Sequence, residues 1–213
     1  MLMLVLFAFM PAMLNENRSL SSSPVKSILP ISGVALACLL VGLVSCAIAP
    51  EAIGPRAIVD RFLDFYFHEY GSGLPDAAQR AKLHPLLSDD LNGALESAAA
   101  AERCASEQAR GQEPPLIQGD IFSSLFEKAT AVVGIEQGPS DGRWLTYRLH
   151  FEWRELGAAE ASVTWTDEVI LQSVDGRWLI DDFVHGGDWQ FTVKGSMKKM
   201  LLDVAALCSP PRR

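Results

Sequence analysis

The sequence lacks a cluster of basic residues. From residue 47 onward, 16 Lys and Arg oppose 25 Asp and Glu, a net charge of −9, and the basic residues are scattered along the chain. Because a nucleic-acid site needs a basic stripe that neutralises phosphates, this charge pattern argues against a nucleic acid as partner. Internal repeats of the length found in solenoids are also missing.

Catalytic and cofactor motifs are missing as well. The chain has no Gly-Xaa-Ser-Xaa-Gly nucleophile elbow, no phosphate-binding loop and no dinucleotide fingerprint. The histidines lie on different predicted elements without the spacing of metal ligands. They are His68, His84, His150 and His185. The sequence therefore predicts no metal and no cofactor, and it favours a protein that is not an enzyme.

Cysteine is scarce, and the position of one cysteine is informative. Cys46 closes an apolar run, residues 28–45, which follows Lys26 and contains no charge. Such a run is typical of a secretory signal peptide. A transmembrane anchor is the alternative, but Pro30 and Gly33 interrupt the run, and its 18 residues are at the lower limit for a membrane span.

The last four residues of this segment, LVSC, resemble the lipobox of bacterial lipoproteins: an aliphatic residue, a small or branched one, Gly, Ala or Ser, and then Cys. The resemblance implies that Cys46 receives a diacylglyceryl group and becomes the mature N-terminus, so the membrane is an expected partner. Ala47 follows the cysteine in place of Asp. In lipoproteins of Gram-negative bacteria this favours the outer membrane, with the domain on its periplasmic face.

The chain divides into five segments. Residues 1–24 hold a second apolar burst and a Ser-rich stretch that a signal peptide does not need, which is explained if Val25 is the true start codon. Residues 25–45 are then the signal peptide, and residues 46–55 form a tether that reaches about 30 Å. The last two segments are a single domain and a short tail: residues 56–208 and 209–213.

Two cysteines remain in the expected mature domain. Cys38 is removed with the signal peptide and Cys46 is lipidated, which leaves Cys104 and Cys208. In an oxidising periplasm these two most simply form a disulfide across a loop of about 100 residues, which contributes roughly 4 kcal/mol in the chain-entropy model. Two buried free thiols are the alternative, because the sequence does not show the geometry that a disulfide needs.

Apolar spacing predicts helices at both ends of the domain. A wide apolar stripe at helical spacing predicts a core helix over residues 56–70. Ser88 is a candidate N-cap for a second helix, which continues to about residue 109. At the C-terminal end, apolar residues at helical spacing predict a third helix over residues 197–208.

Between these helices the period of the apolar pattern changes to two. Four segments rich in β-branched and aromatic residues predict strands over residues 129–138, 143–155, 162–174 and 177–187. Asp175-Gly176 predicts a two-residue hairpin turn between the last two. This order of elements predicts an α+β fold, in which an antiparallel sheet of about four strands packs on N-terminal helices and a C-terminal helix.

Three phrases resemble a bacterial family known as domain of unknown function 3828, many of whose members are lipoproteins. They are LHPLLSDDL, QGDIFSSLFE and DGRWLIDDFVH, and the resemblance covers residues 56–205. It implies a cone-shaped fold similar to nuclear transport factor 2, with a curved antiparallel sheet wrapped on helices. It implies no activity, since the family has no established chemistry and the fold is shared by enzymes, binding proteins and scaffolds.

The turn at residues 175–176 also predicts the register of the last hairpin. Asp167 should lie opposite Val184, and Val169 opposite Asp182, so that the two aspartates are diagonal neighbours on a largely apolar face. Buried together, they could form an acid/base couple. In the alternative, Asp182 hydrogen-bonds to backbone or to a helix N-terminus, and a bulge turns Asp167 outward.

Other polar residues favour structural or surface roles. Asp120 is expected to cap the segment 121–126 rather than to act on a substrate. Residues on the polar phase of two strands predict either a solvated face or a protein-contact surface. These are Arg148, His150, Glu152, Thr164, Thr166 and Glu168.

Together these features predict a periplasmic lipoprotein of the outer membrane, whose domain is a scaffold or binds an envelope protein or a small apolar ligand. An enzyme that uses Asp167 and Asp182 is one alternative. An immunity lipoprotein that blocks a toxin in the periplasm is another.

Overall fold

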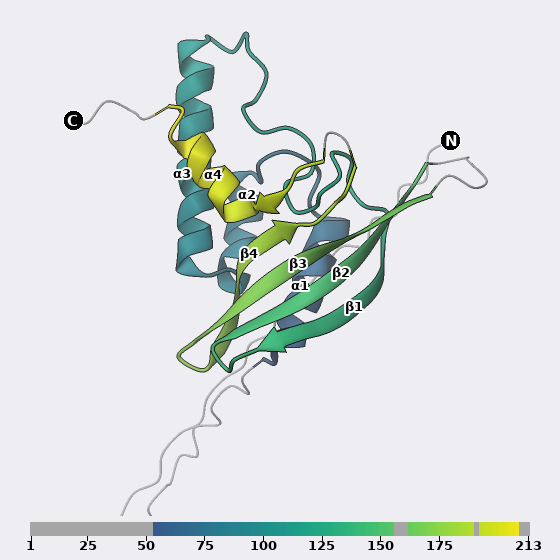
Figure 1. Ribbon diagram of the computed structural model, residues 1–213. Coiled ribbons are helices and arrows are strands. Elements are labelled where there is room, and N and C mark those ends of the chain that lie inside the picture. The colour runs from purple at the N-terminus through teal and green to yellow at the C-terminus, as the bar shows by residue number, and fades with distance from the viewer. Residues whose placement is uncertain (1–52, 156–161, 190–191, 209–213) are drawn as a thin grey trace, which may run out of the picture. The chain divides into compact units, whose positions relative to one another are not determined.

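An antiparallel sheet of five strands, in the order β1-β2-β3-β4-β5, organises the fold (Figure 1). The strands are β1 (Ala131–Ser140), β2 (Trp144–Arg154), β3 (Ser162–Val174), β4 (Arg177–His185) and β5 (Gly195–Ser196). The predicted α+β class is confirmed, and so are the four predicted strands. The short β5, which pairs with the end of β4, was not predicted.

The computed structural model describes residues 53–155, 162–189 and 192–208, which belong to one compact unit. The segments predicted as a start region, a signal peptide, a lipidated cysteine and a tail lie outside these ranges: residues 1–24, 25–45, Cys46 and 209–213.

Helices precede and follow the long strands. They are α1 (Pro55–His68), α2 (Ala77–Leu83), the 3-10 helix η1 (His84–Leu86), α3 (Asp89–Gln108) and α4 (Met197–Ala205). The three predicted helices are confirmed, including the N-cap at Ser88, whose hydroxyl accepts the Leu91 N–H at 3.1 Å. Helix α2 was not predicted because it buries only Leu83 and so has no apolar stripe.

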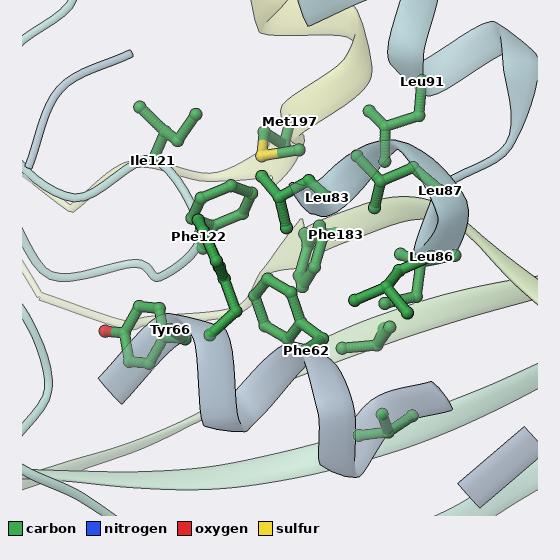
Figure 2. Close-up of a cluster of buried hydrophobic side chains, with 14 of the residues drawn as sticks. Phe62, Tyr66, Leu83, Leu86, Leu87, Leu91, Ile121, Phe122, Phe183 and Met197 are labelled. Atoms are coloured by element: carbon green, nitrogen blue, oxygen red, sulfur yellow. The ribbon is translucent and has the colours of Figure 1, made fainter. Parts of the chain in front are cut away.

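The core lies between α1 and the sheet. Helix α1 crosses one face of the sheet, while α3 and α4 pack together beside β4 (Figure 1). Four buried rings form the centre of the core: Phe62, Tyr66, Phe122 and Phe183 (Figure 2). The ring centroids of Phe62 and Phe183 are 4.6 Å apart, and those of Phe62 and Phe122 are 5.2 Å apart. Aromatic side chains therefore fill the space that the sheet and α1 enclose.

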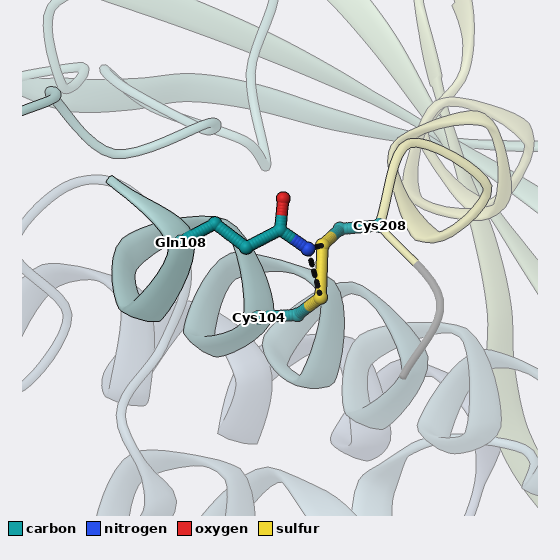
Figure 3. The surroundings of a disulfide bond; sticks show 3 residues. All are labelled: Cys104, Gln108 and Cys208. Carbon is teal, nitrogen blue, oxygen red and sulfur yellow. Dashed lines mark hydrogen bonds between the residues drawn. A yellow bond between two sulfur atoms is a disulfide. The ribbon is translucent and has the colours of Figure 1, made fainter. Parts of the chain in front are cut away.

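A disulfide joins Cys104 of α3 to Cys208, just beyond α4 (Figure 3). The two Cα atoms are 5.9 Å apart, within the usual range for a disulfide. The amide of Gln108 lies over the bond, with its nitrogen 3.5 Å and 3.2 Å from the two sulfur atoms. The predicted pairing is present, so the alternative of two free thiols does not apply.

Replacing both Cys104 and Cys208 by serine should lower the free energy of unfolding by about 4 kcal/mol. The disulfide closes a loop with a sequence separation of 104, and without it the unfolded chain gains conformational entropy. Urea unfolding of the oxidised protein and of the double variant measures the difference. Reduced wild type is the control and should match the variant; equal stability of all three forms would contradict this role of the disulfide.

Candidate functional site

The last hairpin follows the predicted register only next to its turn. Leu171 lies opposite Ile180 as predicted, but Val169 lies opposite Phe183 and not opposite Asp182. A β-bulge between these two pairs adds one residue to β4. Because side chains alternate between the faces of a sheet, the extra residue reverses the orientation of every position of β4 beyond it.

Asp167 and Asp182 are therefore not diagonal neighbours on one face, and that prediction is wrong. Asp182 lies opposite Ile170, whereas Asp167 stays on the core face with 1% of its surface exposed. The alternative that a bulge turns Asp167 outward is also wrong, because the extra residue is Asp181 in β4 and β3 keeps its alternation.

The adjacent aspartates of β4 hold the first turns of two helices. Asp182 accepts the backbone N–H of Lys198 at 2.8 Å and the hydroxyl of Ser196, the N-cap of α4. Asp181 accepts the hydroxyl of Ser88, the N-cap of α3, at 2.7 Å, and pairs with the ammonium of Lys198 at 2.6 Å. A carboxylate at a helix N-terminus is favoured by the helix dipole. The interpretation of Asp182 as a helix-terminus ligand is thus confirmed.

Asp167 accepts four hydrogen bonds. One oxygen accepts the Ser124 hydroxyl and the Gly186 N–H, at 2.8 Å for the latter. The other accepts the Ser124 N–H at 2.8 Å and the indole N–H of Trp165 at 2.9 Å. These bonds fasten an irregular segment, residues 118–128, to the sheet. With both oxygens occupied, the carboxylate acts here as a structural acceptor.

Asp120 is a second buried carboxyl in this segment. One of its oxygens accepts the hydroxyl of Tyr66, and the other accepts the Phe122 N–H at 2.8 Å. Asp120 therefore caps the start of the segment as predicted, although the residues that follow form bends and not a helix. Burial raises the pKa of Asp120 to about 7, against the opposing effects of the hydrogen bonds from Tyr66 and Phe122 and the charge of Lys128.

Two tyrosines surround Asp120: Tyr66 of α1, and Tyr70 just beyond the C-terminal end of this helix. The Tyr66 hydroxyl accepts the Ala129 N–H at 3.0 Å, and the Tyr70 hydroxyl accepts the Ile121 N–H at 3.1 Å. Burial raises the pKa of both tyrosines, so both hydroxyls stay protonated. The apolar stripe of α1 had placed both residues in the core, but it gave no sign of their hydroxyl partners.

Lys128 lies between Asp120 with its two tyrosines and the solvent. Its ammonium donates to the carbonyl oxygens of Tyr70 at 2.5 Å and Phe67 at 3.2 Å, and it lies 5.3 Å from the ring centroid of Tyr66. Desolvation lowers the pKa of Lys128. We call Tyr66, Tyr70, Asp120 and Lys128 the Asp120 cluster.

His185 lies beside the cluster on β4. Its Nε2 is 3.0 Å from the carbonyl oxygen of Ile121, whereas its Nδ1 is buried without a hydrogen-bond partner among the described residues. Burial lowers the pKa of His185, which favours the neutral ring with the proton on Nε2. Of the four histidines, this is the one whose ring is enclosed by the core.

A surface groove of about 520 Å³ runs past the cluster. Its lining includes Gly73, Gly119, Lys128 and Phe126, whose side chain is 60% exposed. The groove reaches the residue before Asp120, but the carboxyl oxygens of Asp120 are held by Tyr66 and Phe122. The arrangement thus places a buried, titratable carboxyl next to a groove. Both oxygens of this carboxyl accept hydrogen bonds from groups of the protein itself.

The predicted polar phase forms the sheet face opposite α1. Arg148 lies between Glu136 at 3.5 Å and Glu168 at 3.7 Å, and His150 Nδ1 is 2.9 Å from the Thr166 hydroxyl. We call these five residues, together with Thr164, the polar sheet face. Glu152 departs from the prediction: it is buried against its neighbours and pairs with Arg154 at 2.8 Å.

Within residues 53–155, 162–189 and 192–208, no three His, Cys, Asp or Glu side chains gather where they could hold a metal ion. In the same residues, no helix combines the length and apolar character that a membrane span needs.

A scan against protein-family models finds no match for this chain, and a search of curated proteins finds no similar sequence.

The contribution of Asp120 to the stability of the folded domain should rise as the pH falls from about 7 to about 4. Because the pKa of Asp120 is about 7 in the fold and 3.8 in the unfolded chain, the folded state binds the proton first. The stabilisation is complete below pH 3.8 and is lost as the pH rises through 7. At about 1.4 kcal/mol per pKa unit, the effect is on the order of 4 kcal/mol.

Urea unfolding at a series of pH values measures this dependence, and the Asp120→Asn variant should lose it, because its amide remains neutral throughout. Asp188→Asn is the matched control, since the Asp188 side chain is 99% exposed, and it should keep the wild-type pH dependence. An Asp120→Asn variant that retained the wild-type dependence would show that another group is responsible.

Proposed function

We propose that this chain is a periplasmic lipoprotein, held in the outer membrane by lipid on Cys46, and that its domain binds another envelope protein without catalysing a reaction. The observation that carries this proposal is the disulfide between α3 and the end of α4. Structural disulfides persist in oxidising compartments such as the periplasm and are rare in the cytosol. The disulfide thus agrees with the export signal that precedes Cys46.

We also propose that the chain is a member of the domain-of-unknown-function family 3828 with a fold similar to nuclear transport factor 2. The order of elements supports this: helices, an antiparallel meander, and a closing helix. The position of α1 across one face of the sheet supports it further (Figure 1).

The internal use of the aspartates favours binding over catalysis. Asp120, Asp167, Asp181 and Asp182 are all buried, and each accepts hydrogen bonds from backbone or side-chain donors of the fold. A general acid or base needs a free position within hydrogen-bond reach of a substrate. The enzyme alternative, with Asp167 and Asp182 acting together, therefore has little support from their surroundings.

The polar sheet face is the surface that we assign to the partner protein. Helix α1 covers the other face, while no helix of the described residues covers this one (Figure 1). Its charges alternate in sign across three strands, with Arg148 between Glu136 and Glu168. Alternating charges give orientation and specificity to a protein partner more than they give affinity. The filled core favours a protein partner over a small apolar ligand inside the cone.

Replacing Cys46 by alanine should remove the protein from the outer-membrane fraction, because the thiol that carries the lipid is lost. Fractionation of cells followed by immunoblotting measures the shift. Cys38→Ala is the matched control, since Cys38 lies in the segment that is removed, and it should remain with the outer membrane. If Cys46→Ala stayed in the outer membrane as the wild type does, the lipid anchor would be wrong. If the wild type itself lay in the inner membrane, the uncleaved-anchor alternative would hold.

A photo-reactive amino acid at Thr164, on the polar sheet face, should form one adduct of defined size in living cells. The same amino acid at Asp188, which is exposed but lies outside that face, should not form this adduct. Arg148→Glu in the Thr164 background should reduce the yield, because it places three acidic side chains together. An adduct of equal yield from both positions would contradict a specific partner on this face.

A further inference from the structure

Two hairpin turns lie side by side at one end of the sheet. The Ser173 N–H donates to the Arg143 carbonyl oxygen at 2.8 Å, which joins the β3–β4 hairpin to the turn between β1 and β2. In the ladders, Trp144 lies opposite Gln172, and Trp178 lies opposite Ser173. The two tryptophans and their turns thus share one end of the domain.

Helix α1 begins at this same end. The residues before β1 contact the C-terminal part of α1, because Lys128 donates to Phe67 and Ala129 donates to Tyr66. Strand β1 then runs toward the other end of the sheet, where α1 begins (Figure 1). The position of Arg56 agrees: burial raises the pKa of Tyr147 on β2, and the charge of Arg56 opposes this shift.

The groups at this end combine partly buried aromatic rings with balanced charge. Trp178 also packs against the hydrophobic core, on the sheet face opposite to that of Trp144. Trp144 and Trp178 are each half-buried, and the guanidinium carbon of Arg143 is 5.7 Å from the Trp144 ring centroid. Arg177 is exposed in the second turn, and Ile53, at the start of the described chain, is 38% exposed. Tryptophan is enriched at membrane interfaces, and arginine can keep its charged head among polar headgroups while its stem contacts apolar surface.

The balanced charges of the two turns suit a phospholipid surface that presents both signs of charge. Each turn contains one aspartate and one arginine: Asp141 with Arg143, and Asp175 with Arg177. The arginines can bind lipid phosphates, and the aspartates balance their charge. A phospholipid layer presents phosphates and ammonium groups together, so it is complementary to such a surface.

The length of the tether brings this end to the membrane. If Cys46 carries lipid, the seven residues from there to Ile53 extend at most about 25 Å. The start of α1 is therefore held within this distance of the bilayer, and the two turns beside it are held with it.

We propose that the tether end, formed by Ile53, Arg143, Trp144, Arg177 and Trp178, docks on the phospholipid surface of the membrane that holds the protein. This inference rests on the proposed lipidation of Cys46. Docking would fix the orientation of the domain, with α1 directed away from the bilayer and the opposite end of the sheet in the periplasm.

Fluorescence quenching tests the docking. The mature lipidated protein is reconstituted into vesicles of phosphatidylethanolamine and phosphatidylglycerol with brominated acyl chains, which quench nearby tryptophans. We expect quenching in the wild type and its loss in a Trp144→Phe/Trp178→Phe variant. A Trp153→Phe/Trp189→Phe variant is the matched control and should keep the quenching, since Trp153 lies at the opposite end of β2.

Charge reversal gives a second measurement on a protein with all its tryptophans. Arg143→Glu/Arg177→Glu should reduce the quenching at least twofold. Arg110→Glu/Lys199→Glu, with the same change of net charge just beyond α3 and on α4, should leave it unchanged. Far-UV circular dichroism verifies that each variant is folded.

Flotation of the same vesicles separates the two proposals. Protein that floats without quenching, or with equal quenching in both tryptophan double variants, would overturn the docking and leave the lipid anchor intact. Protein that does not float would overturn the lipid anchor and the docking together.

Discussion

The fold depends on hydrogen bonds that buried carboxylates accept from backbone N–H groups outside the regular elements. Residues 118–128 cross the core between α1 and the sheet without forming a helix or strand, so their N–H groups cannot find partners within a ladder. A buried N–H without a partner costs about 1–3 kcal/mol. Asp167 accepts from Ser124 and Gly186, and Asp120 accepts from Phe122, which removes this cost at three positions.

The same principle explains how the helices are attached to the sheet. Asp181 and Asp182 bind groups at the N-termini of α3 and α4, and the bulge in β4 lets two consecutive residues do so. An acidic chain without catalytic motifs thus uses four aspartates as internal acceptors. The exposed charges on the polar sheet face and at the tether end are the ones that we propose for contacts with other molecules.

Local patterns predicted much of the secondary structure. The stripe over residues 56–70, the cap at Ser88 and the alternation in four segments each depend on neighbours in sequence, and all correspond to observed elements. Helix α2 was not predicted, because a helix of one or two turns with a single buried residue shows no apolar period. The hydrogen-bond partners of the Tyr66 and Tyr70 hydroxyls were not predicted, because they belong to residues about 50 positions away in the sequence. Their one available signal was that a buried tyrosine hydroxyl needs a partner.

The register of the last hairpin depends partly on local sequence and partly on contacts from distant segments. The Asp175-Gly176 turn determined the pairing of the residues next to it, because a two-residue loop allows one alignment. Beyond Leu171 the alignment was decided by Ser88 and Lys198, which bind Asp181 from helices that are distant in sequence. By itself, the sequence determined the class of fold and the turn, which follow from local pattern, and counting left Cys104 and Cys208 as the one candidate pair, whose bond depends on the tertiary structure. Only the tertiary structure decided which carboxylates are buried together and which residues share an end with α1, because those depend on contacts between segments that no local pattern encodes.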